Sequence, residues 1–250
     1  MKALCVRVLL VSSVVAACGE ARGGEAAAPA AAPRQLIVGI DLSASQSDGR
    51  REAARKALDL VIDELQYGDR IVLLQVHQRG AAEDGAQRWA ETVPVPRDGR
   101  EPTSLDRERL DAVKQAARSV AETMFAHDGA GRLPTTDILA TLHIAAEYMR
   151  DGGSRPATLV LLSDMLQSAH GIEMSRPGGT PGAGWIEQQQ ASGVVPRLEG
   201  ACVAVVGADA TSPNGIVVRD FWQQYFEAAG ASLDQDNYRL IATERGALRC

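Results

Sequence analysis

The sequence predicts an α/β domain with a doubly wound, mostly parallel six-stranded sheet that is flanked by helices. Short, continuous apolar runs alternate with segments of helical periodicity, and such runs are typical of parallel strands buried on both faces. Four of these runs cover residues 36–40, 71–76, 158–162 and 202–206. The run at 88–95 instead alternates polar and apolar residues and includes a proline, which predicts one antiparallel edge strand.

The helices are expected between these strands. Apolar residues recur every three or four positions from 49 to 67, and Gly68 is expected to end that helix. A second helix is predicted over 106–126, with Thr103 or Ser104 as its cap. Further helices are expected from Ile138, near 185–191 and over 217–229, and a last strand over 238–243.

The first 17 residues have the pattern of a secretory signal. Lys2 and Arg7 precede an apolar run that is too short to span a bilayer. The run ends at Val15-Ala16-Ala17-Cys18, which resembles a bacterial lipobox and implies lipid attachment at Cys18. The alternative is an ordinary signal peptide that happens to contain Cys18. Because Gly19 rather than Asp follows, the resemblance favours the outer membrane of a Gram-negative bacterium.

The predicted organisation is therefore a signal peptide (1–17), a lipidated cysteine with a flexible tether (18–34), and a folded domain (35–250). The tether is a low-complexity run of Gly, Ala, Glu and Pro that cannot bury a core. Loss of the signal leaves 24 of the 26 basic residues against 32 acidic ones, a net charge of about −8. This balance argues against nucleic acid as a partner, and it disfavours contact with anionic lipid other than through the anchor.

Two cysteines remain in the predicted domain, Cys202 and Cys250. An exported compartment permits disulfides. Cys202 begins a predicted strand and Cys250 ends the chain, so a bridge between them is one expectation. The alternative is one buried thiol and one terminal thiol.

Oxygen-bearing side chains follow two of the buried strands. Asp41, Ser43 and Ser45 come directly after the first strand, and Asp164 follows the run at 158–162. Thr136 lies in a loop that opens a helix. Ligands of open α/β sheets bind outside the carboxyl ends of the strands, and oxygen donors suit a hard cation. A Ser-rich turn without a ligand is the alternative for the first loop.

This set resembles the metal-ion-dependent adhesion site (MIDAS) of the von Willebrand factor A family, whose pattern is Asp-x-Ser-x-Ser, then Thr, then Asp. The resemblance covers about residues 34–245 and implies a Rossmann-like fold. It implies a divalent cation, with Mg²⁺ expected and Mn²⁺ or Ca²⁺ as alternatives. Thr136 is preferred to Thr135 as the ligand because Asp137-Ile138 follows it, as in many relatives. The ligands so implied are Asp41, Ser43, Ser45, Thr136 and Asp164.

The resemblance also implies the function. A cation held by two carboxylates and neutral hydroxyls keeps an open position. An unidentified protein would occupy it with an Asp or Glu carboxylate, and no enzymatic activity is expected. The alternatives are an envelope structural or assembly factor with an idle or stabilising metal, and a hydrolase that activates water.

Three further features are weighed at this level. His170 follows Asp164 in the irregular segment 165–200, and we expect this segment to shape the rim of the site and to set partner choice; a disordered insertion is the alternative. His170 is not assigned a role at the site. Trp222, Tyr225 and Phe226 are expected to pack in the core, with a partner-binding patch as the alternative.

Overall fold

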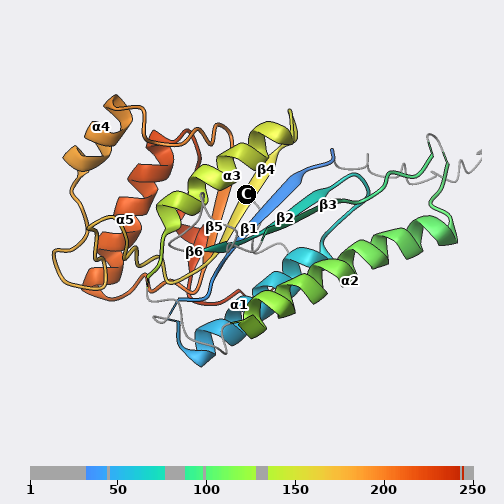
Figure 1. The fold of residues 1–250 in the computed structure, drawn as a ribbon, viewed down its shortest axis with the longest axis horizontal. Helices are drawn as coiled ribbons and strands as arrows, with labels where there is room; N and C mark the ends of the chain where they lie inside the picture. The colour runs from blue at the N-terminus through green and yellow to red at the C-terminus, as the bar shows by residue number, and fades with distance from the viewer. Residues whose placement is uncertain are drawn as a thin grey trace, which may run out of the picture. The chain divides into compact units, whose positions relative to one another are not determined.

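A six-stranded sheet lies at the centre of the domain in the computed structural model (Figure 1). The structure describes residues 32–43, 46–76, 88–97, 100–127, 135–242 and 244, which belong to one compact unit, residues 32–250. The strand order is β3-β2-β1-β4-β5-β6. The strands are β1 (Gln35–Asp41), β2 (Arg70–Val76), β3 (Arg88–Thr92), β4 (Ala157–Leu162), β5 (Cys202–Val206) and β6 (Tyr238–Arg239).

All neighbouring strands are parallel except β2 and β3, so β3 is the predicted antiparallel edge. One face of the sheet packs on α1 (Asp48–Asp63) and α2 (Ser104–His127), and the other on α3 (Ile138–Asp151), α4 (Ala183–Ala191) and α5 (Pro213–Ala228). Successive residues of β1 point to opposite faces, as a strand requires: Val38 packs with α1 and α2, whereas Ile37 packs with α3 and α5. The predicted fold class is confirmed.

Three element boundaries differ from those expected. Helix α1 ends at Asp63, and Gly68 instead provides the positive φ of +85° in the turn that leads into β2. Helix α5 begins at Pro213, four residues before the predicted start, because the Ser212 hydroxyl accepts a hydrogen bond from a first-turn amide and proline suits the first position. Strand β6 ends at Arg239, and the next residues, Leu240 and Ile241, are exposed.

Thr103, one of the two predicted caps, closes the start of α2. Its hydroxyl accepts a hydrogen bond from the Asp106 amide (3.2 Å), and the Asp106 carboxylate accepts one from the Thr103 amide (2.9 Å). This reciprocal arrangement satisfies amides that the helix itself leaves unpaired. The hydrogen bonds from Thr103 lower the pKa of Asp106 below its usual value.

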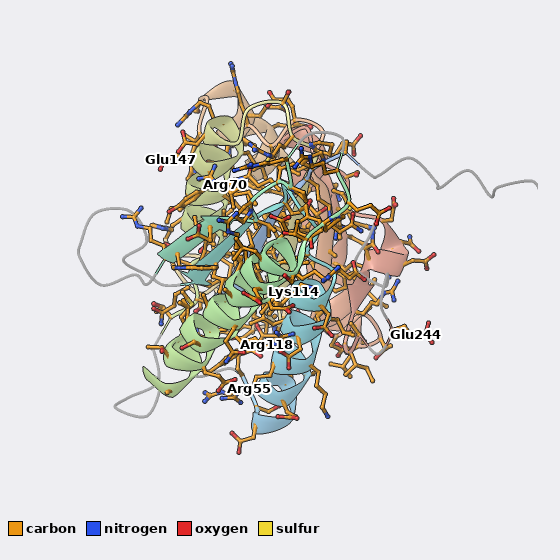
Figure 2. The ribbon with its side chains drawn as sticks, turned by 90° about the vertical axis from the view of Figure 1, so that its right-hand side faces the viewer. Arg55, Arg70, Lys114, Arg118, Glu147 and Glu244 are labelled. Carbon is orange, nitrogen blue, oxygen red and sulfur yellow. The ribbon has the colours of Figure 1, made fainter. Side chains whose placement is uncertain are left out.

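Charged side chains join α1 to α2 on the outer surface. The Arg118 guanidinium contacts the carboxylates of Asp59 and Asp63, and Arg55 lies over the Phe125 ring, 4.4 Å from its centroid. Figure 2 shows Arg55 and Arg118 on this helix pair. In the part of the chain that the structure describes, no helix is both long and apolar enough to cross a membrane.

Cys202 is disulfide-bonded. Cys250, its predicted partner, lies outside the described residues, as do Cys18 and the predicted signal peptide. The Cys202–Cys250 bridge, the lipid at Cys18 and the signal peptide therefore stay predictions.

Candidate metal site

Two buried carboxylates lie at the carboxyl ends of the neighbouring strands β1 and β4. Asp41 is the last residue of β1, and Asp164 follows β4 by two residues. The strands are parallel with Ile40 opposite Leu162, so both chains leave the sheet at one edge. Asp41 and Asp164 are almost fully buried, although a buried carboxylate is costly unless it has partners.

Hydrogen bonds hold the Asp41 carboxylate from three directions. Its Oδ1 accepts a bond from the Ser43 amide (2.9 Å), and its Oδ2 accepts one from the Gln46 side chain (3.2 Å) and one from the Ser163 hydroxyl (2.6 Å). The Ser163 hydroxyl in turn accepts a bond from the Met165 amide (2.9 Å). Ser163 therefore links the two strand ends directly, and the orientation of Asp41 is fixed.

Sequence reasoning missed both Ser163 and Gln46. The signal for Ser163 was present, since it directly precedes Asp164 at the end of a buried strand. Gln46 lies beyond the Asp-x-Ser-x-Ser motif and had no comparable signal. Both side chains are buried and polar, and each donates to Asp41.

A guanidinium lies against Asp164. Nη1 of Arg50, in the first turn of α1, is 3.6 Å from Asp164 Oδ2; the Arg50 side chain is 29 % exposed and that of Asp164 is 1 % exposed. Oδ1 of Asp164 accepts a hydrogen bond from the Leu166 amide (3.1 Å). The protein thus places its own cation beside a predicted metal ligand, which the sequence did not indicate.

The loop with Thr136 is tied to the segment that follows Asp164. The Thr136 amide donates to the Ser168 hydroxyl (2.8 Å), and the Ser168 amide donates to the Thr136 carbonyl (3.0 Å). Thr136 is buried. The hydroxyl of Thr135 is also buried and has no hydrogen-bond partner among the described residues, so both threonines stay candidates for the ligand.

Gln167 closes the start of α3 from the other side of the loop. Its side-chain carbonyl accepts hydrogen bonds from the Ile138 and Leu139 amides (2.7 and 3.3 Å), and its NH₂ donates to Asp137 (3.1 Å). His170 Nε2 lies 2.6 Å from the other oxygen of Asp137. His170 therefore contacts the residue next to Thr136, and among the described residues it has no hydrogen bond or ion pair to a predicted ligand.

The segment 165–200 packs on the domain and contains α4. Met165 has a positive φ of 64°, and its carbonyl accepts a hydrogen bond from the Trp222 indole (2.8 Å). Trp222, Tyr225 and Phe226 are buried, which confirms the core packing predicted for them. The segment is therefore ordered, and the alternative of a disordered insertion is wrong. The role of the segment in partner choice stays a prediction.

Tyr238 is a buried tyrosine whose ionisation is linked to the site. Its hydroxyl has no hydrogen-bond partner among the described residues. Burial raises the pKa of this phenol, and the negative charge of Asp164 raises it further.

The donor set suits a hard cation. Asp41, Ser43, Thr136 and Asp164 all offer oxygen and are all buried. Within the described ranges, no cluster of three or more His, Cys, Asp or Glu side chains could hold a metal ion. A cation at this site would therefore depend on the two carboxylates together with hydroxyl ligands. Ser45 lies outside the described residues. A metal-free protein can neutralise Asp164 in part with Arg50.

This chain is similar to known proteins in its three-dimensional structure but not significantly in its sequence. No protein-family model matches the sequence, and no curated protein matches it significantly. A von Willebrand factor type A protein from Catenulispora acidiphila is 17% identical, with 79% of this chain and 43% of that chain covered and a TM-score of 0.39.

Two other solved structures are similar. Proximal thread matrix protein 1 from the mussel byssus, with a zinc-occupied MIDAS motif, is 14% identical over 86% of this chain and 45% of that chain (TM-score 0.41). The pilus adhesin SpaC from Lactobacillus rhamnosus GG is 13% identical over 88% and 29% (TM-score 0.45). The chain spans less than half the length of each of these three proteins.

Proposed function

We propose that the domain binds a protein partner through a divalent cation, with Mg²⁺ the expected ion. The observation that carries this proposal is the pair of buried carboxylates, Asp41 and Asp164, at the ends of adjacent parallel strands and joined through Ser163. Two carboxylates neutralise a dication, and the hydroxyls of Ser43 and Thr136 add no charge. A cation so held stays electrophilic toward a carboxylate of a partner.

The first experiment measures the cation alone. Mn²⁺, which also takes oxygen ligands, is titrated into the folded domain by calorimetry. Asp164→Asn should abolish the binding heat, because it leaves the site with only one carboxylate, that of Asp41. Asp59→Asn is the matched control: the same change on the outer face of α1 should bind Mn²⁺ like the wild type. No binding to the wild-type domain would contradict the proposal.

The second experiment concerns the partner. The domain is used to capture proteins from an envelope extract with Mg²⁺ or with EDTA, in parallel with Asp164→Asn and Asp59→Asn. The proposal requires a captured protein that is lost with EDTA and with Asp164→Asn but kept with Asp59→Asn. Equal capture in all four conditions would refute cation-dependent binding.

A second candidate is an envelope structural or assembly factor whose site is idle. The Arg50–Asp164 ion pair favours this candidate, since it offsets part of the charge of Asp164 without a metal. The Mn²⁺ titration separates the two, because an idle site gives no binding heat at millimolar metal. We propose binding rather than catalysis in either case.

We also propose that the protein is exported and anchored by lipid at Cys18, in the outer membrane of a Gram-negative bacterium. The lipobox pattern before Cys18 supports this. Metabolic labelling with a clickable fatty acid in a bacterial host should mark the wild-type chain, and Cys18→Ala should lose the label. Labelling of Cys18→Ala equal to that of the wild type would contradict the proposal.

A further inference from the structure

A cavity lies at the other end of the sheet from the candidate metal site, where strands β4 and β5 begin. It has a volume of about 710 Å³ and is lined by the carboxyl-terminal half of α3, the turn before β4 and the turn before β5. Strand β4 separates it from Asp164. At about 3.3 Å per residue this strand is about 20 Å long, so the cavity is distinct from the candidate metal site.

Three arginines line this cavity, one from each of the three segments. They are Arg150 at the end of α3, Arg155 before β4 and Arg197 before β5. In the part of the chain that the structure describes, none of the three forms an ion pair, whereas Arg34, Arg50, Arg55, Arg118 and Arg219 all do. Segments that are distant in the sequence thus place three arginines along one cavity, and none of these has a carboxylate partner among the described residues.

One of the three arginines is held in place. Nη1 of Arg155 donates a hydrogen bond to the Gly152 carbonyl (3.0 Å), one of the carbonyls left unpaired at the end of α3. A guanidinium has five N–H groups, so most of its donors are left for a ligand. Arg155 is therefore a preorganised donor at the cavity wall.

The wall is not purely cationic. Glu147 and Glu199 also line the cavity, and three arginines against two glutamates leave an excess of one positive charge. The carboxyl end of α3 adds a small negative potential. The whole chain has a net charge of −6, whereas the charged side chains that line this cavity sum to +1. The local charge therefore favours an anion.

Apolar atoms supply the rest of the lining. Met149 and Pro196 are partly or fully buried there, and Ala146 and Ala157 add methyl groups. The cavity is far larger than a bare phosphate ion requires, and ligand pockets typically span about 300–1,000 Å³. An occupant therefore needs an organic body as well as a charged group.

We propose that this cavity binds an organic oxyanion, a small molecule with a phosphate or carboxylate group that Arg150, Arg155 and Arg197 bind through their guanidinium groups. Guanidinium groups match both oxyanions geometrically through paired N–H donors. The apolar wall contacts the organic body, and Glu147 and Glu199 disfavour ligands that carry further negative charge on that body. The site works independently of the metal.

The test titrates phenyl phosphate and benzoate into the intact domain by calorimetry at constant ionic strength. Each probe has one oxyanion group, a phosphate or a carboxylate, on an uncharged apolar body. The variant carries Arg150→Gln, Arg155→Gln and Arg197→Gln. The control carries Arg55→Gln, Lys114→Gln and Arg118→Gln, which remove the same charge from α1 and α2. Figure 2 shows these three residues on that helix pair and Glu147 on α3.

At least one probe should bind the wild type and the control with equal affinity. The same probe should bind the cavity variant at least about tenfold more weakly, because its charge-assisted hydrogen bonds are lost. Tighter binding of phenyl phosphate assigns a phosphate ligand, and tighter binding of benzoate assigns a carboxylate ligand. If the triple variant fails to fold, Arg150→Gln with Arg197→Gln keeps the Arg155 contact to Gly152 and serves the same purpose. No binding of either probe at about 10 mM, or equal binding to the cavity variant, would overturn the proposal.

Discussion

Replacement of Arg50 by Gln should raise the affinity of the candidate site for a divalent cation. Nη1 of Arg50 lies 3.6 Å from Asp164 Oδ2, and a bound dication competes with it for this carboxylate. At an effective dielectric constant of about 20, two unit charges at this distance attract by roughly 4–5 kcal/mol. Desolvation and the partial exposure of Arg50 reduce the net value to about 1–2 kcal/mol, which corresponds to about tenfold in the dissociation constant.

The assay compares Mn²⁺ affinity by calorimetry with urea unfolding in EDTA. R50Q should bind Mn²⁺ about tenfold more tightly and, without metal, unfold more easily by about 1 kcal/mol, because Asp164 loses its cation. Arg55→Gln, on the same helix but paired with Glu122, should leave Mn²⁺ affinity unchanged. An affinity of R50Q equal to or weaker than that of the wild type would refute the competition between Arg50 and the metal.

Three other predictions follow from single contacts. Gln167→Ala should lower the free energy of unfolding by about 3 kcal/mol in urea titrations, because two amides of α3 and the Asp137 carboxylate lose a buried partner; a loss below about 1 kcal/mol would contradict this. Trp222→Phe should cost about 1–3 kcal/mol by the same measurement, since the Met165 carbonyl is left without its indole donor; a neutral effect would contradict this. Hydrogen bonds from Ser212 and Thr211 hold the pKa of Asp209 below its ordinary value of 3.8. The ionised Asp209 carboxylate therefore contributes its full stabilisation of the fold above pH 3.8, and this contribution is lost as the pH falls through the lowered pKa. Thermal melts from about pH 5 to 2 should therefore show a shallower acid loss for Asp209→Asn than for the wild type, and parallel curves would exclude this role.

The fold could be predicted because burial leaves a periodic record in the sequence. Each continuous apolar run became a strand with both faces covered, and β3, whose pattern alternates, became the antiparallel edge. The last strand was overestimated. Tyr238 is buried but Leu240 and Ile241 are exposed, so hydrophobicity alone did not fix where β6 ends.

The carboxylates of the site could be predicted because parallel strands end at one edge, which puts Asp41 and Asp164 at neighbouring positions without knowledge of the loops. The contacts of Arg50 and Gln167 could not be predicted in this way. Gln167 lies in an aperiodic segment and caps a helix that begins 29 residues earlier. Such contacts depend on how loops pack in three dimensions, and no local pattern encodes them.

The central position of β1 has a mechanical consequence. The chain enters β1 at Gln35 and reaches the candidate site at Asp41, while β2 and β4 run parallel on either side. A pulling force between the start of this strand and a partner held at its far end would act along the strand axis. Both hydrogen-bonded ladders would then be loaded in shear, so their bonds would have to rupture together rather than unzip one by one. If the domain binds a partner at this site as proposed, β1 would therefore resist a force applied between its two ends.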